Sequence, residues 1–359
     1  MTGVTGRFPM WRPAVLGRSA RTAPSAESPG DHESVPSLGN GITRPIPPSE
    51  YSRWLGTLDA VTPLESHPEF LTDWMGVRTR MAMLPWAPQE FVGTVSSRHP
   101  IPDDGYRSED FEYVALARAI AARTTPFQMI EIGAGWAPWS VAAIVACRER
   151  GRDARAVAVE ADQRRVEWAA RHAEDNGINA RVVIGDHNSI DAEIAEWRAD
   201  DSHPLLIVCA AAWHSSGELS FPNVPVDDMG AAIWTLPGTD VDYRGAHLEH
   251  SPIPAIAMSS LLAGLRDPIV DLLHVDVQGV EFELLATCAH EVQERVLLMA
   301  VGTHSRMSEG RLLDFFLPRG WGVVIDSPCR AEYLMTRPTL AGFTVQDGMQ
   351  LWENPFLTE

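Results

Sequence analysis

The sequence predicts an α/β protein in which a mostly parallel sheet is covered by helices on both faces. Short apolar segments alternate with helical segments from residue 127 to residue 325. Strands that are joined through helices pair in parallel by right-handed crossovers. The first apolar segment also runs directly into a glycine-rich turn, GAG at 133–135, and such turns lie at the edge of a parallel sheet where ligands bind.

Composition and charge exclude several classes of function. The chain has 359 residues, a formal net charge of −19 and no lysine, which excludes Schiff-base and phosphate-loop lysines. The excess acid lies after residue 100, and because such a surface repels phosphates we expect no nucleic-acid partner. No apolar run approaches the ~20 residues of a membrane span. Four widely separated cysteines indicate free thiols in a reducing cytoplasm.

Two segments precede the expected sheet. Residues 1–48 are rich in Pro, Ser, Gly and Arg, which predicts a disordered arm. Residues 49–104 are expected to form a helical extension, with short helices at 54–58 and 70–75, where apolar residues recur at spacings of three and four.

Residues 105–359 form the expected main domain, which opens with a helix over Glu109–Arg123 capped by Ser108. The expected strands are Phe127–Ile132, Ala154–Glu160, Asp271–Asp276, Val296–Val301 and Gly322–Ile325, and the helices lie at 138–150, 162–176, 280–288 and 308–317. Two segments, Ala180–Ile184 and Leu205–Ala210, compete for the third strand. An insertion at about 212–255 is rich in Gly, Pro and aromatic residues, and its alternating runs predict β-hairpins at the rim of the sheet.

The segment MIEIGAGWAPWS, residues 129–140, indicates a nucleotide site. Gly133 and Gly135 allow the backbone to turn tightly and approach a ligand. A dinucleotide fingerprint requires a third glycine at position 138, where this chain has proline. Glu131 instead suits the methionine ammonium group of S-adenosylmethionine, and Trp136 is a candidate to line the same site.

A second carboxylate, Glu160, ends the next strand in VAVEAD. There it can accept hydrogen bonds from both hydroxyls of a ribose. Dehydrogenases and methyltransferases both use a carboxylate in this place, so Glu160 indicates a nucleoside without identifying the cofactor.

Two further stretches, LLHVDVQGVEFELL at 272–285 and MAVGTHSRMSEGRLLDFFLPRGW at 299–321, resemble the FkbM family of methyltransferases. The family pattern is a strand that ends in Asp276, followed by Gln278, Gly279 and Glu281 at the start of a helix, with His304 after the next strand. The resemblance extends to CAAAWHSSGELSFP and DGMQLWENP and covers most of residues 105–355.

This chain departs from the family at three positions. His274 replaces a frequent lysine, Gln278 replaces a glutamate, and Ala137 replaces the third glycine of the turn. None of these changes removes a group that is needed to hold the cofactor, but they leave the identity of the general base open.

The resemblance implies a Rossmann-like class I fold with seven strands, S-adenosylmethionine as methyl donor, and an O-methyl transfer. The implied acceptor is a hydroxyl of a small molecule, such as a sugar, polyketide, glycolipid or glycosylated antibiotic; a homo-oligomer stays open. Asp276 is expected beside the reacting methyl group, with His304 as base and Glu281 orienting either of them. The resemblance favours Leu205–Ala210 as third strand, whereas the rival assignment places Asp186 at the adenine edge.

Alternatives to this interpretation stay open. An NAD-dependent oxidoreductase would share the fold and Glu160, but Pro138 and Glu131 disfavour it. A non-catalytic binding protein is disfavoured because Glu131 and Asp276 are both present. A divalent metal is conceivable but not required, and its candidate ligands, which lack a recognised spacing, are Asp240, Asp242, His247, Glu249 and His250.

Overall fold

The structure is a computed structural model, and it describes residues 46–231, 241–242, 245–333, 335–337, 339 and 341–357. The arm predicted for residues 1–48 therefore lies outside the described residues up to position 45. From Ile46 onward the chain is packed on the main domain. Ile46 is 8% exposed, and its N–H donates to the carbonyl of Val324 at 3.0 Å.

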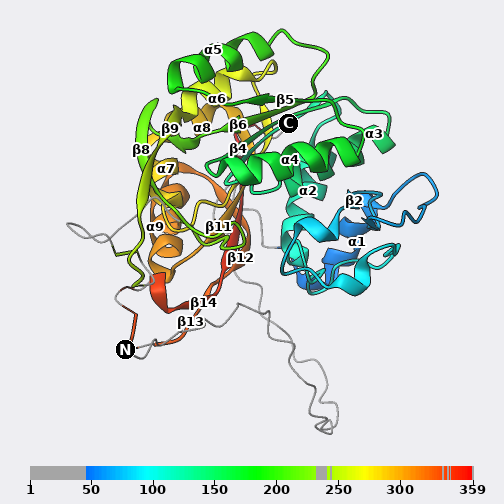
Figure 1. The fold of residues 1–359 in the computed structure, drawn as a ribbon, viewed down its shortest axis with the longest axis horizontal. Coiled ribbons are helices and arrows are strands. Elements are labelled where there is room, and N and C mark those ends of the chain that lie inside the picture. The colour runs from blue at the N-terminus through cyan, green and yellow to red at the C-terminus, as the bar shows by residue number, and fades with distance from the viewer. Residues whose placement is uncertain are drawn as a thin grey trace, which may run out of the picture. The chain divides into compact units, whose positions relative to one another are not determined.

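The main domain is built on an eight-stranded sheet with the strand order β12-β15-β11-β10-β3-β4-β6-β5 (Figure 1). In that order the strands are Gly322–Ser327, Gly348–Glu353, Val296–Thr303, Val270–Val275, Phe127–Ile132, Ala154–Glu160, Leu205–Cys209 and Ala180–Val183. All neighbours are parallel except that β15 runs antiparallel to both β11 and β12. The predicted α/β class and mostly parallel sheet are confirmed.

The sheet has one strand more than the seven expected. Both segments that compete for the third position form strands: β6 pairs with β4, and β5 pairs with the outer side of β6. β5 is an edge strand, and its Val182 is 40% exposed. The expectation that one segment would exclude the other was wrong because the sheet has room for an additional edge strand.

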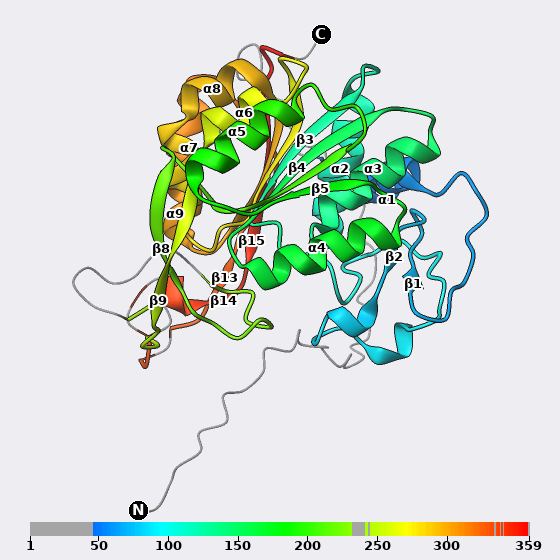
Figure 2. The same ribbon diagram turned by 45° about the horizontal axis from the view of Figure 1, so that its top comes forward.

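Helices cover both faces of the sheet, as predicted (Figure 2). One layer consists of α2 (Asp110–Ala122), α3 (Pro138–Glu149) and α4 (Gln163–Asp175). The other consists of α5 (His187–Trp197), α6 (Met258–Gly264), α7 (Glu281–Thr287), α8 (Ala289–Arg295) and α9 (Arg306–Phe316). Successive residues of a strand face opposite layers: Met129 of β3 packs in the first cluster, and Ile130 packs in the second.

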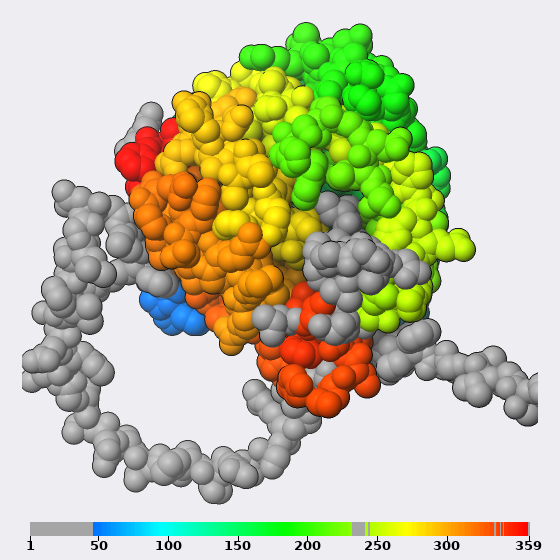
Figure 3. Space-filling model, turned by 90° about the vertical axis from the view of Figure 1, so that its left-hand side faces the viewer, coloured from blue at the N-terminus to red at the C-terminus, as the bar shows by residue number. Residues whose placement is uncertain are grey.

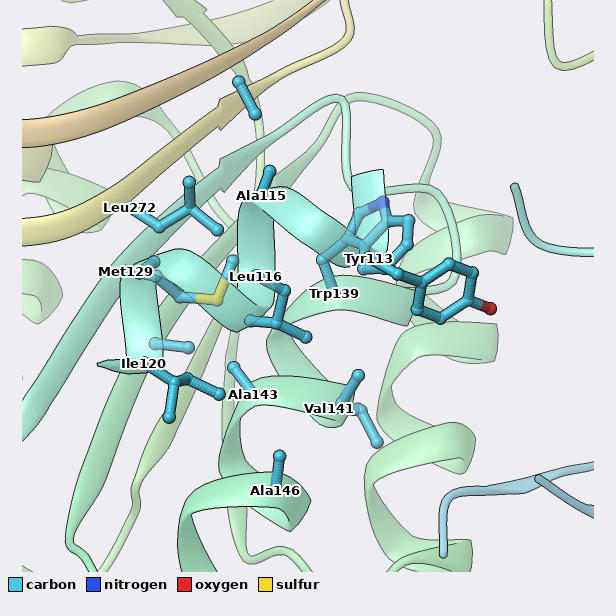
Figure 4. Packing of buried hydrophobic residues seen from close by; sticks show 14 of the residues in the cluster. Tyr113, Ala115, Leu116, Ile120, Met129, Trp139, Val141, Ala143, Ala146 and Leu272 are labelled. Carbon is cyan, nitrogen blue, oxygen red and sulfur yellow. The ribbon is translucent and has the colours of Figure 1, made fainter. Parts of the chain in front are cut away.

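The apolar face predicted for α2 lies against the sheet. Figure 4 shows its Leu116 and Ile120 close to Met129 of β3 and Leu272 of β10. The predicted cap was wrong. The N-cap residue is Glu109, and its side chain makes no capping hydrogen bond. The Ser108 hydroxyl donates to the Glu109 carboxylate at 3.3 Å.

The N-terminal extension contains one of its two expected helices. α1 (Tyr51–Leu55) is helical, but residues 71–72 form β1, which pairs antiparallel with β2 (Arg78–Thr79). The carboxylate of Asp73 accepts the N–H groups of Met75 and Val77, each at 2.9 Å. This side-chain bonding stabilises a turn and competes with a helix.

The insertion forms a three-stranded sheet, and one of its two strand pairs is antiparallel, as in the predicted β-hairpins. Its strands are β7 (Ala211–Trp213), β8 (Gly217–Pro222) and β9 (His250–Ala257). β8 pairs antiparallel with β9, and β7 pairs parallel with it. β9 contacts α5 and α6 of the second helical layer, and Figure 3 shows this side of the molecule, with the yellow-green surface of the insertion. Residues 232–240 and 243–244 of the insertion lie outside the described residues.

Substitution of Gly133 tests whether the close approach of the Asp276 carbonyl requires glycine at this position. Its φ is +75°, and an added Cβ would lie 1.8 Å from the carbonyl oxygen of Asp276. We expect Gly133→Ala to lower the free energy of unfolding by about 3–5 kcal/mol, because backbone strain and a clash add. Urea denaturation measures this difference.

Gly151→Ala is the matched control for that substitution. Gly151 also has a positive φ, +65°, but nothing lies within 4 Å of its added Cβ. It should cost about 1 kcal/mol, from strain alone. Equal losses for the two variants would show that the contact with Asp276 is not a constraint.

Candidate active site

The ends of three central strands meet at one junction. The N–H of Asp276, after β10, donates to the Ile132 carbonyl of β3 at 2.9 Å, and the N–H of Gly133 donates to the Val159 carbonyl of β4 at 3.0 Å. Because Gly133 has no side chain, the carbonyl of Asp276 can pass directly over it. The junction therefore fixes the residue after β10 beside the glycine turn.

A cavity of about 110 Å³ opens at this junction. Strand ends supply most of its wall, and the insertion supplies the rest. Three of the predicted site residues, Gly133, Glu160 and Asp276, line it. The other principal lining residues are Ile132, Val159, Arg165, Ala210, Ala211, Ala212, Met229 and Gln278.

Glu160 is 4% exposed at the tip of β4. Its carboxylate accepts the N–H of Gly135 at 2.7 Å and the N–H of Asp162 at 2.8 Å, and Arg165 Nη1 lies 3.8 Å from Oε1. Burial raises the pKa of Glu160 although Arg165 and the two N–H groups oppose the shift. Gly135 thus contributes to the site by orienting this carboxylate.

Two other predicted cofactor residues, Glu131 and Trp136, are not among the residues that line the cavity. The carboxylate of Glu131 accepts the N–H groups of Trp139 at 3.1 Å and Ser140 at 2.7 Å, so it caps the start of α3. The Trp136 ring packs against Tyr106 at 6.4 Å between centroids, in the apolar cluster of the N-terminal extension.

Asp186 is a third predicted cofactor residue that does not line the cavity. It is the N-cap of α5 and accepts the N–H groups of Asn188 and Ser189, each at 2.9 Å. Both N–H groups donate to Oδ1, so Asp186 acts as a helix cap, and its predicted contact with adenine stays a prediction.

The three predicted catalytic side chains are in direct contact. His304, after β11, places Nδ1 2.6 Å from Glu281 Oε1 and Nε2 3.2 Å from Asp276 Oδ1. Glu281 is fully buried and also accepts the Ser308 hydroxyl at 3.1 Å and the Gly279 N–H at 2.7 Å. The Asp276 side chain is 40% exposed. The imidazole therefore connects a buried carboxylate to one that faces the cavity.

The charges of these groups follow from their surroundings. Burial alone would lower the pKa of His304, but Asp347, Glu281 and Asp276 together raise it well above its ordinary value. Burial would raise the pKa of Asp276, but His304 outweighs it and lowers that pKa. Both directions are those of an imidazolium that donates to two carboxylates, an arrangement that favours Asp276 over His304 as the base.

Two further groups near this centre were not among the predicted site residues. Asp347, in the turn between β14 (Thr344–Gln346) and β15, lies 3.9 Å from His304 Nε2 and is 55% exposed. It stands in the DGMQ stretch of the family resemblance, but nothing in that stretch distinguishes it. The second group is a buried pair: His274 Nε2 lies 2.9 Å from Glu112 Oε1. Burial alone would lower the pKa of His274, but its hydrogen bond to Glu112 and the charge of Glu112 raise it.

Other expectations concern a metal and the membrane. Asp240, one of the candidate ligands, lies outside the described residues. Within the residues that the structure does describe, no group of three or more His, Cys, Asp or Glu is arranged to hold a metal ion. In the same part of the chain, no helix has the length and apolar character that crossing a membrane requires.

The charge of His304 can be tested by its effect on stability. Because the folded-state pKa is raised, the stabilisation from charged His304 is full below the unfolded pKa of about 6.5 and is lost as pH rises through the folded value. We expect His304→Gln to cost about 3 kcal/mol near pH 6, since it leaves buried carboxylates unpaired, and less near pH 9. Urea denaturation across this range measures the difference.

His290→Gln is the control for that experiment. Its side chain is 79% exposed on α8, so its replacement should change stability little at any pH. A cost for His304→Gln that stayed constant from pH 6 to pH 9 would show that folding does not raise the pKa of His304.

Known proteins that are similar to this chain include proteins named as methyltransferases. No protein-family model matches the sequence. A protein from Jannaschia sp. (strain CCS1) named "Putative methyltransferase" is 27% identical over 291 residues, which are 80% of this chain and 93% of the relative.

Solved structures give more distant matches. One is methyltransferase FkbM from Methylobacillus flagellatus KT, with TM-score 0.34 and 10% identity over 63% of this chain; the chain spans only 43% of that protein. Another is the C-terminal domain of precorrin-6Y C5,15-methyltransferase from Rhodobacter capsulatus, with TM-score 0.34 and 12% identity over 70% of this chain and 91% of that one.

The predicted resemblance to methyltransferases is confirmed by the Jannaschia relative. The fold and this relationship together support an S-adenosylmethionine-dependent methyltransferase. The chain is thus similar in sequence to a protein named as a methyltransferase, and its own sheet has the α/β architecture described above.

Proposed function

We propose that this protein is an O-methyltransferase that transfers the methyl group of S-adenosylmethionine to a hydroxyl of a small molecule, such as a sugar or a natural product. The observation that carries the proposal is the position of Asp276. Its ionised and partly exposed carboxylate lies in the same cavity as Gly133 and Glu160, and His304 holds it there.

The residues of the cavity fit a sulfonium nucleoside. Glu160 offers carboxylate oxygens for a ribose diol, and Ile132, Val159 and the run Ala210–Ala212 offer apolar walls for a base. The cavity also lies at the carboxyl ends of the parallel strands, where ligands of such sheets bind. When bound, S-adenosylmethionine would supply an electrophilic methyl group at this edge. Glu131 is omitted from this set because it caps α3.

The acid–base roles follow from the charges. A hydroxyl becomes a good nucleophile only as its proton leaves, and a nearby carboxylate can accept that proton late in the reaction. Asp276 is assigned this role because it faces the cavity. His304 is assigned as a positioning residue, since its imidazolium donates to Asp276 while Glu281 fixes the ring from its other nitrogen.

The acidic surroundings of Asp276 favour a small-molecule acceptor over a nucleic acid. Asp347 shares the imidazolium of His304 with it. Burial raises the pKa of Glu109, at the start of α2, to about 7, and the negative charge of Asp347 contributes to this rise. A nucleic acid would bring phosphates toward these carboxylates, and such repulsion disfavours binding.

The cofactor part of the proposal is tested by calorimetry with S-adenosylhomocysteine. We expect wild-type protein to bind it with a Kd on the order of micromolar. Glu160→Gln should weaken binding about tenfold or more, because a charge-assisted hydrogen bond is lost. Asp186→Asn serves as control and should bind like wild type. Absence of heat with wild type, or a loss confined to the Asp186 variant, would contradict the proposal.

The catalytic part is tested with methyl-labelled S-adenosylmethionine and a panel of hydroxyl-bearing sugars and glycosylated natural products. We expect label in an ether product with wild type. Asp276→Asn should keep S-adenosylhomocysteine binding and lose turnover by 100-fold or more, on the order of a general-base contribution. Normal turnover by this variant, or label found on nitrogen or carbon, would refute the assignment.

A further inference from the structure

One wall of the cavity is supplied by the insertion and not by a strand end. Residues 223–231, which we call the strap, follow β8 and include Met229 and Ala231, both of which line the cavity. The Met229 side chain reaches the glycine turn: a Cβ added to Gly135 would lie 2.9 Å from its Cε. The strap therefore covers the same strand edge at which the cofactor site is proposed.

The strap is attached to helix α4 through its backbone carbonyls. Arg164 Nη2 donates to the Val224 carbonyl at 2.7 Å. Arg165 donates from Nε to the Val226 carbonyl at 3.4 Å and from Nη2 to the Asp228 carbonyl. The opposite walls are strand ends that the hydrogen bonds of the sheet hold in place. These side-chain attachments can instead be broken without disturbing the sheet.

Arg165 also contacts the carboxylate assigned to the ribose. It is 4% exposed, and its remaining terminal nitrogen, Nη1, lies 3.8 Å from Glu160 Oε1. The planar guanidinium presents its donors in a fixed fork. A shift of Glu160 toward a ligand would therefore act on the same group that holds the strap.

The size of the cavity indicates which wall has to move. Its volume is about 110 Å³, whereas sites for small-molecule ligands occupy roughly 300–1,000 Å³. A second cavity of about 550 Å³ shares Ala161 and Phe221 with it, and Asn223 and Val224 of the strap line that second cavity. The junction of β3, β4 and β10 cannot widen easily, because backbone hydrogen bonds from Asp276 to Ile132 and from Gly133 to Val159 join the strand ends. Displacement of Met229 and its neighbours would enlarge the cavity toward the surface.

We propose that the strap, residues 223–231, opens to admit the cofactor nucleoside and closes over it, and that Arg165 is the positioning residue that couples its closure to Glu160. The inference rests on the proposed function, since it takes a nucleoside as the ligand. It assigns Arg165 and Met229 a part in the binding and release of the cofactor.

The direct test is hydrogen–deuterium exchange of the wild-type chain with and without S-adenosylhomocysteine, combined with stopped-flow measurement of its dissociation. We expect the amides of residues 223–231 to exchange more slowly in the complex. Arg165→Met should release the ligand about tenfold faster or more, because hydrogen bonds to a charged donor are lost. Met229→Ala should speed both association and dissociation of the ligand. This second variant tests the strap even if the Arg165 variant does not fold.

Arg171→Met is the matched control, because Arg171 lies on the same helix with a side chain that is 51% exposed and paired with Glu174. It should leave both rates unchanged. A double-mutant cycle tests whether Arg165 acts through Glu160. If it does, the effect of Arg165→Met on the release rate should be smaller in the Glu160→Gln background.

The outcomes distinguish the two proposals. If wild type does not bind S-adenosylhomocysteine, the proposed function fails. If wild type binds it but the strap gains no protection, and Arg165→Met and Arg171→Met release it at the same rate, the strap is a static wall and this inference is overturned. A lower melting temperature for Arg165→Met without a change in release rate would likewise overturn it.

Discussion

The close passage of the Asp276 carbonyl over Gly133 is the contact on which the rest of the site depends. An added Cβ at Gly133 would lie 1.8 Å from that oxygen, so only glycine permits the ends of β3 and β10 to meet there. The hydrogen bond from Gly133 to Val159 then brings in the end of β4. As a result, Glu160 and Asp276, which are far apart in sequence, line one cavity.

Charge balance around His304 is the second constraint. Glu281 is fully buried, and a buried carboxylate is stable only when it is paired and hydrogen-bonded. The imidazolium supplies that pairing and uses its other nitrogen for Asp276. The three side chains therefore act as one unit, in which the buried carboxylate sets the orientation of the ring and the ring sets the charge of the exposed carboxylate.

The sequence was most informative where a motif residue directly follows a strand. Asp276 and His304 come after neighbouring parallel strands, whose ends must lie at one edge, so their contact could be expected. It was less informative for Glu131 and Asp186, because a carboxylate beside a helix start either faces a ligand or caps the helix, and the sequence is the same in both cases. Arg165 and Asp347 could not be found from sequence. Arg165 contacts carbonyls of the insertion, and Asp347 lies in a turn that is distant in sequence from its partner His304.

The proposed function depends on where the nucleoside of the cofactor binds. The most direct measurement is a crystal structure of the protein with S-adenosylhomocysteine. The account predicts the ribose hydroxyls within hydrogen-bonding distance of Glu160, in the cavity beside Gly133, with Met229 covering the ligand. A nucleoside bound elsewhere on the chain, or a ribose with no contact to Glu160, would contradict it.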